Sequence, residues 1–256
     1  GLLCAAVFAV AALSGTASPS VRAAASGENV TGDLLEMQGI PLDADAAAVQ
    51  TERIPVYGAD NSTATAYAED RYASHAGYDT LSDEQKQLYN AMKQAAHTFY
   101  VGSADAESVS YSTGTMDCCV AVDTGSQSLN KEDVVRAISM FRNDNPVYFF
   151  LGSSFLYSTD YDFWTGKSYI DMVYLSCAEN CTDGTERQAE RKVLENQIVT
   201  VETKVKAGET ALEKARIAHD WLVDTITYAY DANGDPDNSM TSHSITGVFD
   251  AQYHTA

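Results

Sequence analysis

The chain has 256 residues, 45% of them hydrophobic, which suits one or two domains with a substantial core. Its 36 acidic residues against 16 basic ones give a formal net charge of −20 at pH 7. A surface of that sign repels phosphate backbones and anionic lipids, so nucleic acid is excluded as an expected partner. The simplest interpretation of the charge is solubility.

The first 25 residues have the pattern of a partial signal peptide. Residues 2–13 form an apolar run too short to span a bilayer, and the alanines at 23–25 supply a small-residue cleavage pattern. We therefore expect a secreted or cell-surface protein without a membrane span. The alternative, a buried N-terminal helix, is disfavoured by the flanking Gly, Ser and Pro residues.

Residues 26–80 are predicted to be a linker or disordered arm. They are rich in Ala, Asp, Ser and Thr and show little periodicity. The alternative is a folded role for residues 54–57, Ile-Pro-Val-Tyr, as an added edge strand. Regular structure is expected to begin at Ser82.

Residues 81–206 are predicted to form an N-terminal α+β domain. Two residue pairs have the spacing of helix capping boxes: Ser82 with Gln85, and Asn130 with Asp133. Pro146 should stop the second helix, because the residue before a proline avoids the helical region. Strands are expected where Tyr, Phe and β-branched residues gather, at residues 108–122, 147–151, 155–157 and 169–177.

A long helix over residues 185–205 closes this domain. Its apolar positions recur at intervals of four, three and four: Leu194, Ile198, Val201 and Val205. Its charged positions are expected to form a solvated face: Glu186, Arg187, Glu190, Arg191 and Lys192.

Four cysteines follow the predicted signal: Cys118, Cys119, Cys177 and Cys181. The first two point to opposite faces if they lie in a strand. Export permits disulfides, and a bond between Cys177 and Cys181 would close a small loop. No CxxC pair is present, so we expect structural or free thiols, with no metal and no other cofactor.

Residues 207–256 open with another helix. Thr210 and Glu213 have the spacing of a third capping box. An apolar stripe follows at Leu212, Ala215, His219, Leu222 and Ile226. After a β-favouring run at 227–230, residues 231–237 alternate like a calcium loop. Pro236 stands where such a loop requires Gly, so a polar loop is expected there.

Three segments of this region resemble the opening part of a bacterial transglutaminase-like domain, of the papain-like cysteine enzyme class. They read KARIAHDWL, ITYAYD and SHSITGVFDAQYHTA. In that family a nucleophile motif of the Val-Cys-Glu-Gly-Tyr type follows, with a catalytic His and Asp further on. The resemblance implies that the chain is a fragment of a longer exported enzyme, ending at Ala256 just before the nucleophile. A looser match covers residues 144–150.

Acyl transfer of this kind needs a thiolate, a histidine and a residue that orients the histidine. None of the upstream cysteines opens a predicted helix, where the dipole would favour a thiolate, so no catalytic residue is assigned in this chain. His219 is expected to be a core histidine with one buried hydrogen bond. Tyr230, His243 and His254 could line the site.

Two functions are compatible with the sequence. The first is a transglutaminase-like cysteine enzyme acting on amide bonds of proteins or peptides, as a hydrolase or an acyl transferase. Its partner would be a protein or peptide substrate, which can be associated with the cell wall. The second is a non-catalytic surface module for adhesion or wall binding, built on the aromatic strands of residues 82–205. Those aromatic residues are more simply explained by core packing.

Overall fold

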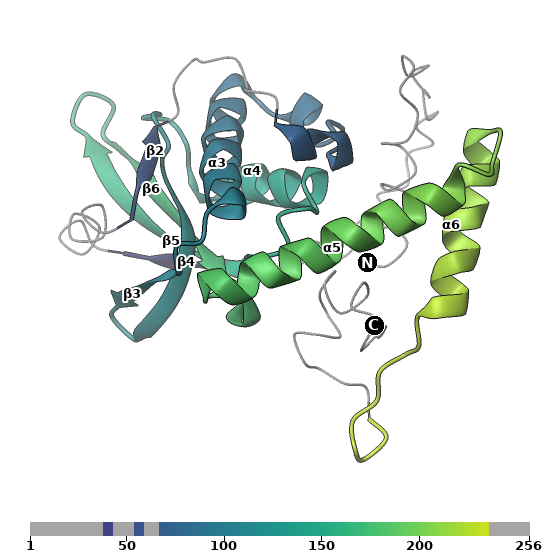
Figure 1. The fold of residues 1–256 in the computed structure, drawn as a ribbon. Helices are drawn as coiled ribbons and strands as arrows, with labels where there is room; N and C mark the ends of the chain where they lie inside the picture. The colour runs from purple at the N-terminus through teal and green to yellow at the C-terminus, as the bar shows by residue number, and fades with distance from the viewer. Residues whose placement is uncertain (1–37, 43–53, 59–66, 236–256) are drawn as a thin grey trace.

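The computed structural model describes residues 38–42, 54–58 and 67–235 (Figure 1). Over these residues the chain has a mixed α/β architecture of four α-helices and a six-stranded mixed sheet, consistent with the expected α+β class. In chain order the elements are β1 (Gln38–Pro41), β2 (Val56–Gly58), η1 (Ala68–Tyr72), η2 (Tyr78–Thr80), α3 (Asp83–Val101), β3 (Glu107–Tyr111), β4 (Gly114–Asp123), α4 (Lys131–Asp144), β5 (Leu151–Asp162), β6 (Lys167–Cys177), η3 (Glu179–Cys181), α5 (Gly184–Val205) and α6 (Ala211–Thr225).

The sheet is built around a central antiparallel pair. Its order is β1-β5-β6-β4-β2, and β3 pairs with the first half of β4. β5 and β6 form a long hairpin, and β6 continues the antiparallel pairing to β4. The two short strands β1 and β2 are both parallel to their neighbours, β5 and β4.

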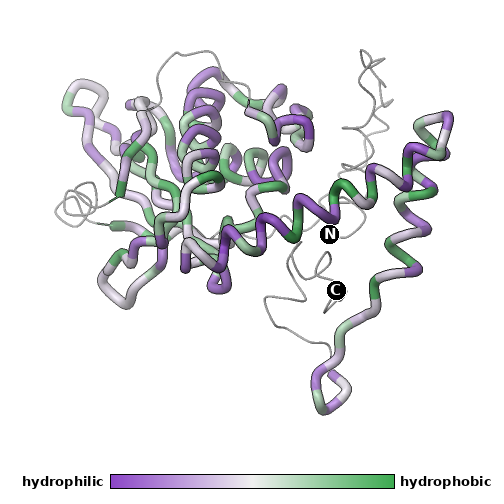
Figure 2. Tube along the Cα trace, in the orientation of Figure 1, coloured by the Kyte–Doolittle hydropathy of each residue, from purple (hydrophilic) through white to green (hydrophobic). Residues whose placement is uncertain are grey.

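The main core lies between the sheet and the helices α3 and α4, which share one side of it (Figure 1). α3 contributes Leu88 and Met92, α4 contributes Ile138 and Phe141, and all four side chains are fully buried. The opposite face of the sheet carries a smaller cluster that includes Leu156. Hydrophobic segments accordingly follow the strands (Figure 2).

The predicted helix starts are confirmed, because each depends on bonds within one turn. Ser82, Asn130 and Thr210 all accept a hydrogen bond from the backbone N–H three residues later, and all three capping boxes are formed. α4 ends at Asp144, before Asn145 and Pro146, as predicted.

The linker predicted for residues 26–80 is wrong where the structure describes it. Residues 38–41 and 56–58 are strands of the sheet, so the alternative of an edge strand at residues 54–57 is the better one. The segment that follows is fastened by Asp144, whose buried carboxylate accepts hydrogen bonds from Ser74 Oγ, Gly77 N and Tyr78 N. Long-range pairing, which local composition does not reveal, orders these residues.

The strands also differ from the prediction. Residues 147–150 are a turn region rather than a strand, and β5 runs from Leu151 to Asp162, well beyond the predicted 155–157. The aromatic residues before β5 serve the core: Tyr148 and Phe150 are buried against α3 and α4. These aromatic residues anchor a turn in the core, and in the sequence they resemble the apolar run of a strand.

α5 and α6 form an extension of the molecule. α5 begins beside the sheet and runs away from it, and α6 turns off steeply from its far end (Figure 1). A separate small cluster joins the two helices through Leu194, Val201, Val205 and Ala218. Within the described ranges, none of the helices combines the length and the apolar character that crossing a membrane requires.

Candidate functional site

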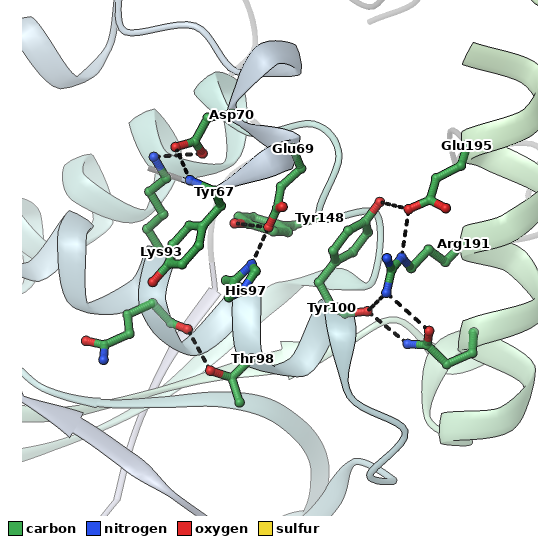
Figure 3. A network of polar contacts seen from close by, with 12 residues as sticks. Tyr67, Glu69, Asp70, Lys93, His97, Thr98, Tyr100, Tyr148, Arg191 and Glu195 are labelled. Atoms are coloured by element: carbon green, nitrogen blue, oxygen red, sulfur yellow. Dashed lines mark hydrogen bonds and ion pairs between the residues drawn. The ribbon is translucent and has the colours of Figure 1, made fainter. Parts of the chain in front are cut away.

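Two neighbouring groups of polar contacts join η1 to α3 (Figure 3). Glu69 and Asp70 are consecutive in η1, while Lys93 and His97 lie one turn apart on α3. His97 Nδ1 lies 2.5 Å from Glu69 Oε1, and Lys93 Nζ lies 2.8 Å from Asp70 Oδ1. Lys93 and Glu69 are both buried.

Aromatic rings enclose these contacts. The Tyr67 ring stacks on His97 with centroids 3.7 Å apart, and the Tyr148 hydroxyl donates to Glu69 Oε1 over 3.3 Å. Burial first, and the Glu69 carboxylate second, raises the pKa of Tyr148, which therefore stays a donor. An imidazole hydrogen-bonded to a carboxylate is the base-and-orienter pair of acid–base catalysis. Here Tyr67 covers one face of the ring, and the pair fastens η1 to α3.

The role of His97 is not visible in the sequence, which favours a solvated histidine beside an apolar stripe. Its side chain is only 26% exposed, because η1 folds over it. The one available signal is the pair Lys93 and His97, four residues apart and so on the same helix face. Their partners, Glu69 and Asp70, lie in the segment predicted to be a linker.

A further polar group connects α3 to α5. Arg191 Nε donates to Glu195 Oε1 over 2.8 Å, and the Tyr100 hydroxyl donates to the same carboxylate (Figure 3). Gln188 Nε2 donates to the carbonyls of Tyr100 and Gly102, at 2.8 and 2.7 Å. The last carbonyls of α3, which have no partner within their own helix, are thus satisfied by side chains of α5.

Arg187 does not belong to the solvated face predicted for α5. It is 1% exposed. Its guanidinium donates to the carbonyls of Cys181 and Ala104, and it lies 3.6 Å from the centroid of the Phe99 ring. Burial lowers the pKa of Arg187, although the neighbouring Cys177, Cys119 and Cys181 oppose that shift. The carbonyl partners and the ring offset the cost of burying the charge.

Cys118, Cys119, Cys177 and Cys181 are free thiols in the structure, so the predicted bond between Cys177 and Cys181 is not formed. Burial raises the pKa of Cys118 and Cys119, and it raises the pKa of Cys181 to about 12. A thiol that stays protonated is a poor nucleophile. These three cysteines therefore do not suit a papain-like reaction.

α6 places the His-Asp pair of the resemblance at the surface. His219 is not the expected core histidine: its side chain is 61% exposed, and its Nδ1 lies 3.2 Å from Asp220 Oδ1. The helix packs on α5 through Ala218, Ile217 and Trp221 instead. The reason is that α5 covers the helix face next to the predicted stripe, which leaves His219 in solvent.

Of the remaining predicted site residues, the structure describes Tyr230 alone. Tyr230 is 64% exposed, and its ring lies beside that of Tyr228, with centroids 5.1 Å apart. His243 and His254 lie outside the described residues. The polar loop predicted after Tyr230 is closed on itself, since Asp231 Oδ1 accepts from the backbone of Asn233 and Asp235.

No set of three or more His, Cys, Asp or Glu side chains is arranged to hold a metal ion in the part of the chain that the structure describes. Comparison with known protein families, curated proteins and solved structures finds no match to this chain. Its own residues are therefore the basis for a functional proposal.

One surface feature is not evident from the sequence pattern alone. The β5–β6 hairpin ends in a turn that holds Phe163 and Trp164 in solvent, 89% and 98% exposed, with Tyr161 beside them. Asp162 fixes the turn: its carboxylate accepts from Trp164 N at 2.8 Å and Thr165 Oγ1 at 2.6 Å. The available signal is an Asp-Phe-Trp-Thr-Gly turn between two aromatic strands.

Proposed function

We propose that this chain is part of an exported, transglutaminase-like cysteine enzyme that acts on amide bonds of proteins or peptides. In this proposal residues 81–206 form a domain that precedes the catalytic core, and residues 207–256 are the opening part of that core. The nucleophile is supplied by a cysteine outside the 256 residues. Burial raises the pKa of Cys118, Cys119 and Cys181, and Cys177 ends a strand, where no helix dipole favours a thiolate.

The observation that carries the proposal is the uncovered face of α6. α6 carries the His-Asp-Trp-Leu segment of the resemblance and leans on α5 through Ala218. Its apolar Leu212 and Val223 stay 80% and 64% exposed, and hydrophobic segments remain visible along it (Figure 2). A helix with two apolar sides is normally covered on both. The second side would pack against the catalytic core.

The first test reads the gene beyond the codon for Ala256. A Cys-Glu-Gly-Tyr-like motif within a few codons, with His and Asp codons further on, is the expected result. The extended protein should then release ammonia from glutamine-containing peptides or couple an amine to them. Replacing the new cysteine by Ala should abolish both reactions. A reading frame without such a cysteine would refute the proposal.

A specific observation favours a second function for the domain itself, namely binding of a neutral glycan at a cell surface. Trp164 and Phe163 offer two exposed ring faces on a turn that Asp162 fixes. Aromatic faces stack on the C–H groups of sugar rings, and a net charge of −20 disfavours polyanionic glycans. The domain would then hold the enzyme near wall-associated protein substrates.

The second function is tested by sedimentation with insoluble neutral wall glycan. We expect the chain to be retained, and the Phe163→Ala/Trp164→Ala variant to lose at least about tenfold in affinity, a loss of ~1.4 kcal/mol or more. Tyr228→Ala removes another exposed ring elsewhere and should bind like the parent. Equal retention of both variants would exclude the hairpin as the binding surface.

A further inference from the structure

The four cysteines that the structure describes are divided between the two faces of the sheet. Cys118 packs in the cluster of Leu156 and Ala121 on one face. Cys119, Cys177 and Cys181 all pack in the main core on the other face, and we call them the three-thiol cluster. The prediction that adjacent Cys118 and Cys119 point to opposite faces is therefore confirmed. It leaves the members of the three-thiol cluster as potential partners of one another.

An irregularity in β4 turns Cys119 toward the end of β6. Cys118 is paired with Ser176 and Val120 with Leu175, so Cys119 is the extra residue between two ladder positions. Its Sγ lies 3.3 Å from the carbonyl oxygen of Ser176, the residue just before Cys177. Its second backbone contact is the Leu175 carbonyl oxygen, at 3.7 Å. The neighbouring Cys177 adds to the rise in the pKa of the Cys119 thiol that burial causes.

Cys181 is engaged differently. It lies at the end of η3, and its thiol faces its own neighbour, with Sγ 3.6 Å from Asn180 Oδ1. Disulfide formation requires two cysteines close enough for their side chains to meet. Cys119 and Cys177 lie on the same face of neighbouring strands, and the Cys119 thiol contacts the carbonyl just before Cys177, whereas Cys181 turns its thiol to Asn180.

We infer that Cys119 and Cys177 form a disulfide that ties β4 to the end of β6 in an oxidising medium. This pairing replaces the Cys177–Cys181 bond that sequence spacing suggests, and it does not depend on the proposed function. The bond would close a loop containing α4 and β5, which restricts the unfolded chain more than the short loop between Cys177 and Cys181 does.

The oxidant is a small-molecule disulfide of the glutathione type. Cys177, which is partly exposed, loses its proton and attacks one sulfur of that disulfide, releasing one small thiolate. Cys119 then loses its proton and attacks the Cys177 sulfur of the mixed disulfide, releasing the second. Two protein thiols are oxidised, one external disulfide is reduced to two thiols, and the two protons end on those thiols.

One neighbour of Cys119 assists the second step. Burial and the neighbouring Cys177 and Cys118 raise the pKa of the Cys119 thiol, and the Arg187 guanidinium offsets part of that rise. Arg187 donates to the carbonyl of Cys181 and so lies beside the three-thiol cluster. It offers a positive charge where the attacking sulfur becomes negative.

The experiment uses the folded full chain. The protein is incubated with oxidised and reduced glutathione, its free thiols are alkylated, and its peptides are mapped without reduction. Mapping is done on Cys118→Ser as well, because Cys118 and Cys119 share a peptide. We expect one cross-link, between the peptides of Cys119 and Cys177, retained in Cys118→Ser and Cys181→Ser and lost in Cys119→Ala and Cys177→Ala.

A bond between Cys119 and Cys177 should also shift stability. Oxidised parent and Cys181→Ser should unfold at higher urea concentration than the same proteins after reduction, whereas Cys177→Ala should show no difference. Far-UV circular dichroism checks that each variant is folded. If Cys119→Ala does not fold, Cys177→Ala alone provides the variant that lacks the bond. A Cys177–Cys181 cross-link, a link through Cys118, or full alkylation of all cysteines after oxidation would each overturn the inference.

Discussion

Arg187 is a buried cation whose hydrogen bonds go to backbone carbonyls. It donates to Cys181 O, Ala104 O and Gly102 O and stacks on the Phe99 ring. These carbonyls belong to three segments: the end of η3, the residue after α3 and the loop before β3. One side chain therefore holds together the start of α5, the end of α3 and the three-thiol cluster.

Replacing Arg187 by Met should lower the free energy of unfolding by about 2–4 kcal/mol, because its carbonyl partners lose a charged donor. Arg191→Met is the matched control, one turn later on the same helix. Its side chain is 23% exposed, pairs with the half-exposed Glu195 and donates to one backbone carbonyl, that of Tyr100, so its loss should cost about 1 kcal/mol. Urea unfolding measures both. Equal losses would mean that Arg187 does not tie the three segments together.

The buried thiols predict how the reduced protein responds to alkaline pH. Burial raises the pKa of Cys181 from 9.0 to about 12, and that of Cys118 and Cys119 also rises. The folded state therefore favours the protonated thiol. This contribution is complete below pH 9 and is lost as the pH rises from 9 toward 12, since the unfolded chain releases its protons first.

The unfolding free energy of the reduced protein should accordingly fall as the pH rises above about 9. Unfolding is measured by urea titration with a phosphine reductant present, between about pH 8 and 10. At higher pH the ionisation of tyrosines would dominate the change in unfolding free energy. Cys181→Ala should show a shallower fall over that range than the parent. An identical slope in both proteins would show that the Cys181 thiol does not titrate with a raised pKa.

At the scale of elements, β1 is held by close contact with β5. A Cβ at Gly39 would lie 2.6 Å from Phe155 Cζ and 3.1 Å from Lys131 Cε. Phe155 is fully buried and cannot move aside. Gly39→Ala should therefore destabilise the protein by about 1–3 kcal/mol through overpacking.

Gly58 in β2 gives the matched control for that change. Apart from Gly58 and its two chain neighbours, no atom of the described residues lies within 4 Å of the position that a Cβ would take there, and β2 is likewise a short parallel strand. Gly58→Ala should change the unfolding free energy by less than about 0.5 kcal/mol, or stabilise slightly. Thermal unfolding compares the two variants. Similar losses in both would argue against close packing of β1 on Phe155.

The elements predicted correctly from the sequence are those with local causes. Capping boxes at Ser82, Asn130 and Thr210 depend on atoms three residues apart, and the sequence displays both partners. β1 and β2 depend on partners far along the chain, and each is too short to show an alternating pattern. The same limit applies to His97 and Arg187, whose partners come from other segments.

At the scale of the whole molecule, the parts of the chain differ in how much apolar surface they bury. The sheet, α3 and α4 share one large core, whereas α6 is attached through the small cluster of α5. Only Ala218 of α6 is buried, and its other side chains are exposed or half-buried. Local stability follows the density of buried contacts, so α6 should open without the rest of the molecule.

Hydrogen exchange tests this division. Amide protection in α6 should be well below that of β5 and β6, and it should end near Tyr230. Trp221→Ala removes a half-buried ring from the cluster of α5 and α6. The lost burial is worth ~1.5–3 kcal/mol, so amide protection in α6 should fall by about tenfold or more. Trp164→Ala, at the exposed hairpin tip, should leave α6 unchanged.

Protection in β5 and β6 should be the same in both Trp variants, because neither ring belongs to the main core. If Trp221→Ala lowered protection in the sheet as much as in α6, the two parts would unfold as one unit. α6 would then owe its order to the whole domain rather than to α5. The uncovered Leu212 and Val223 would in that case be ordinary surface residues, which give no reason to expect a packing partner on that side.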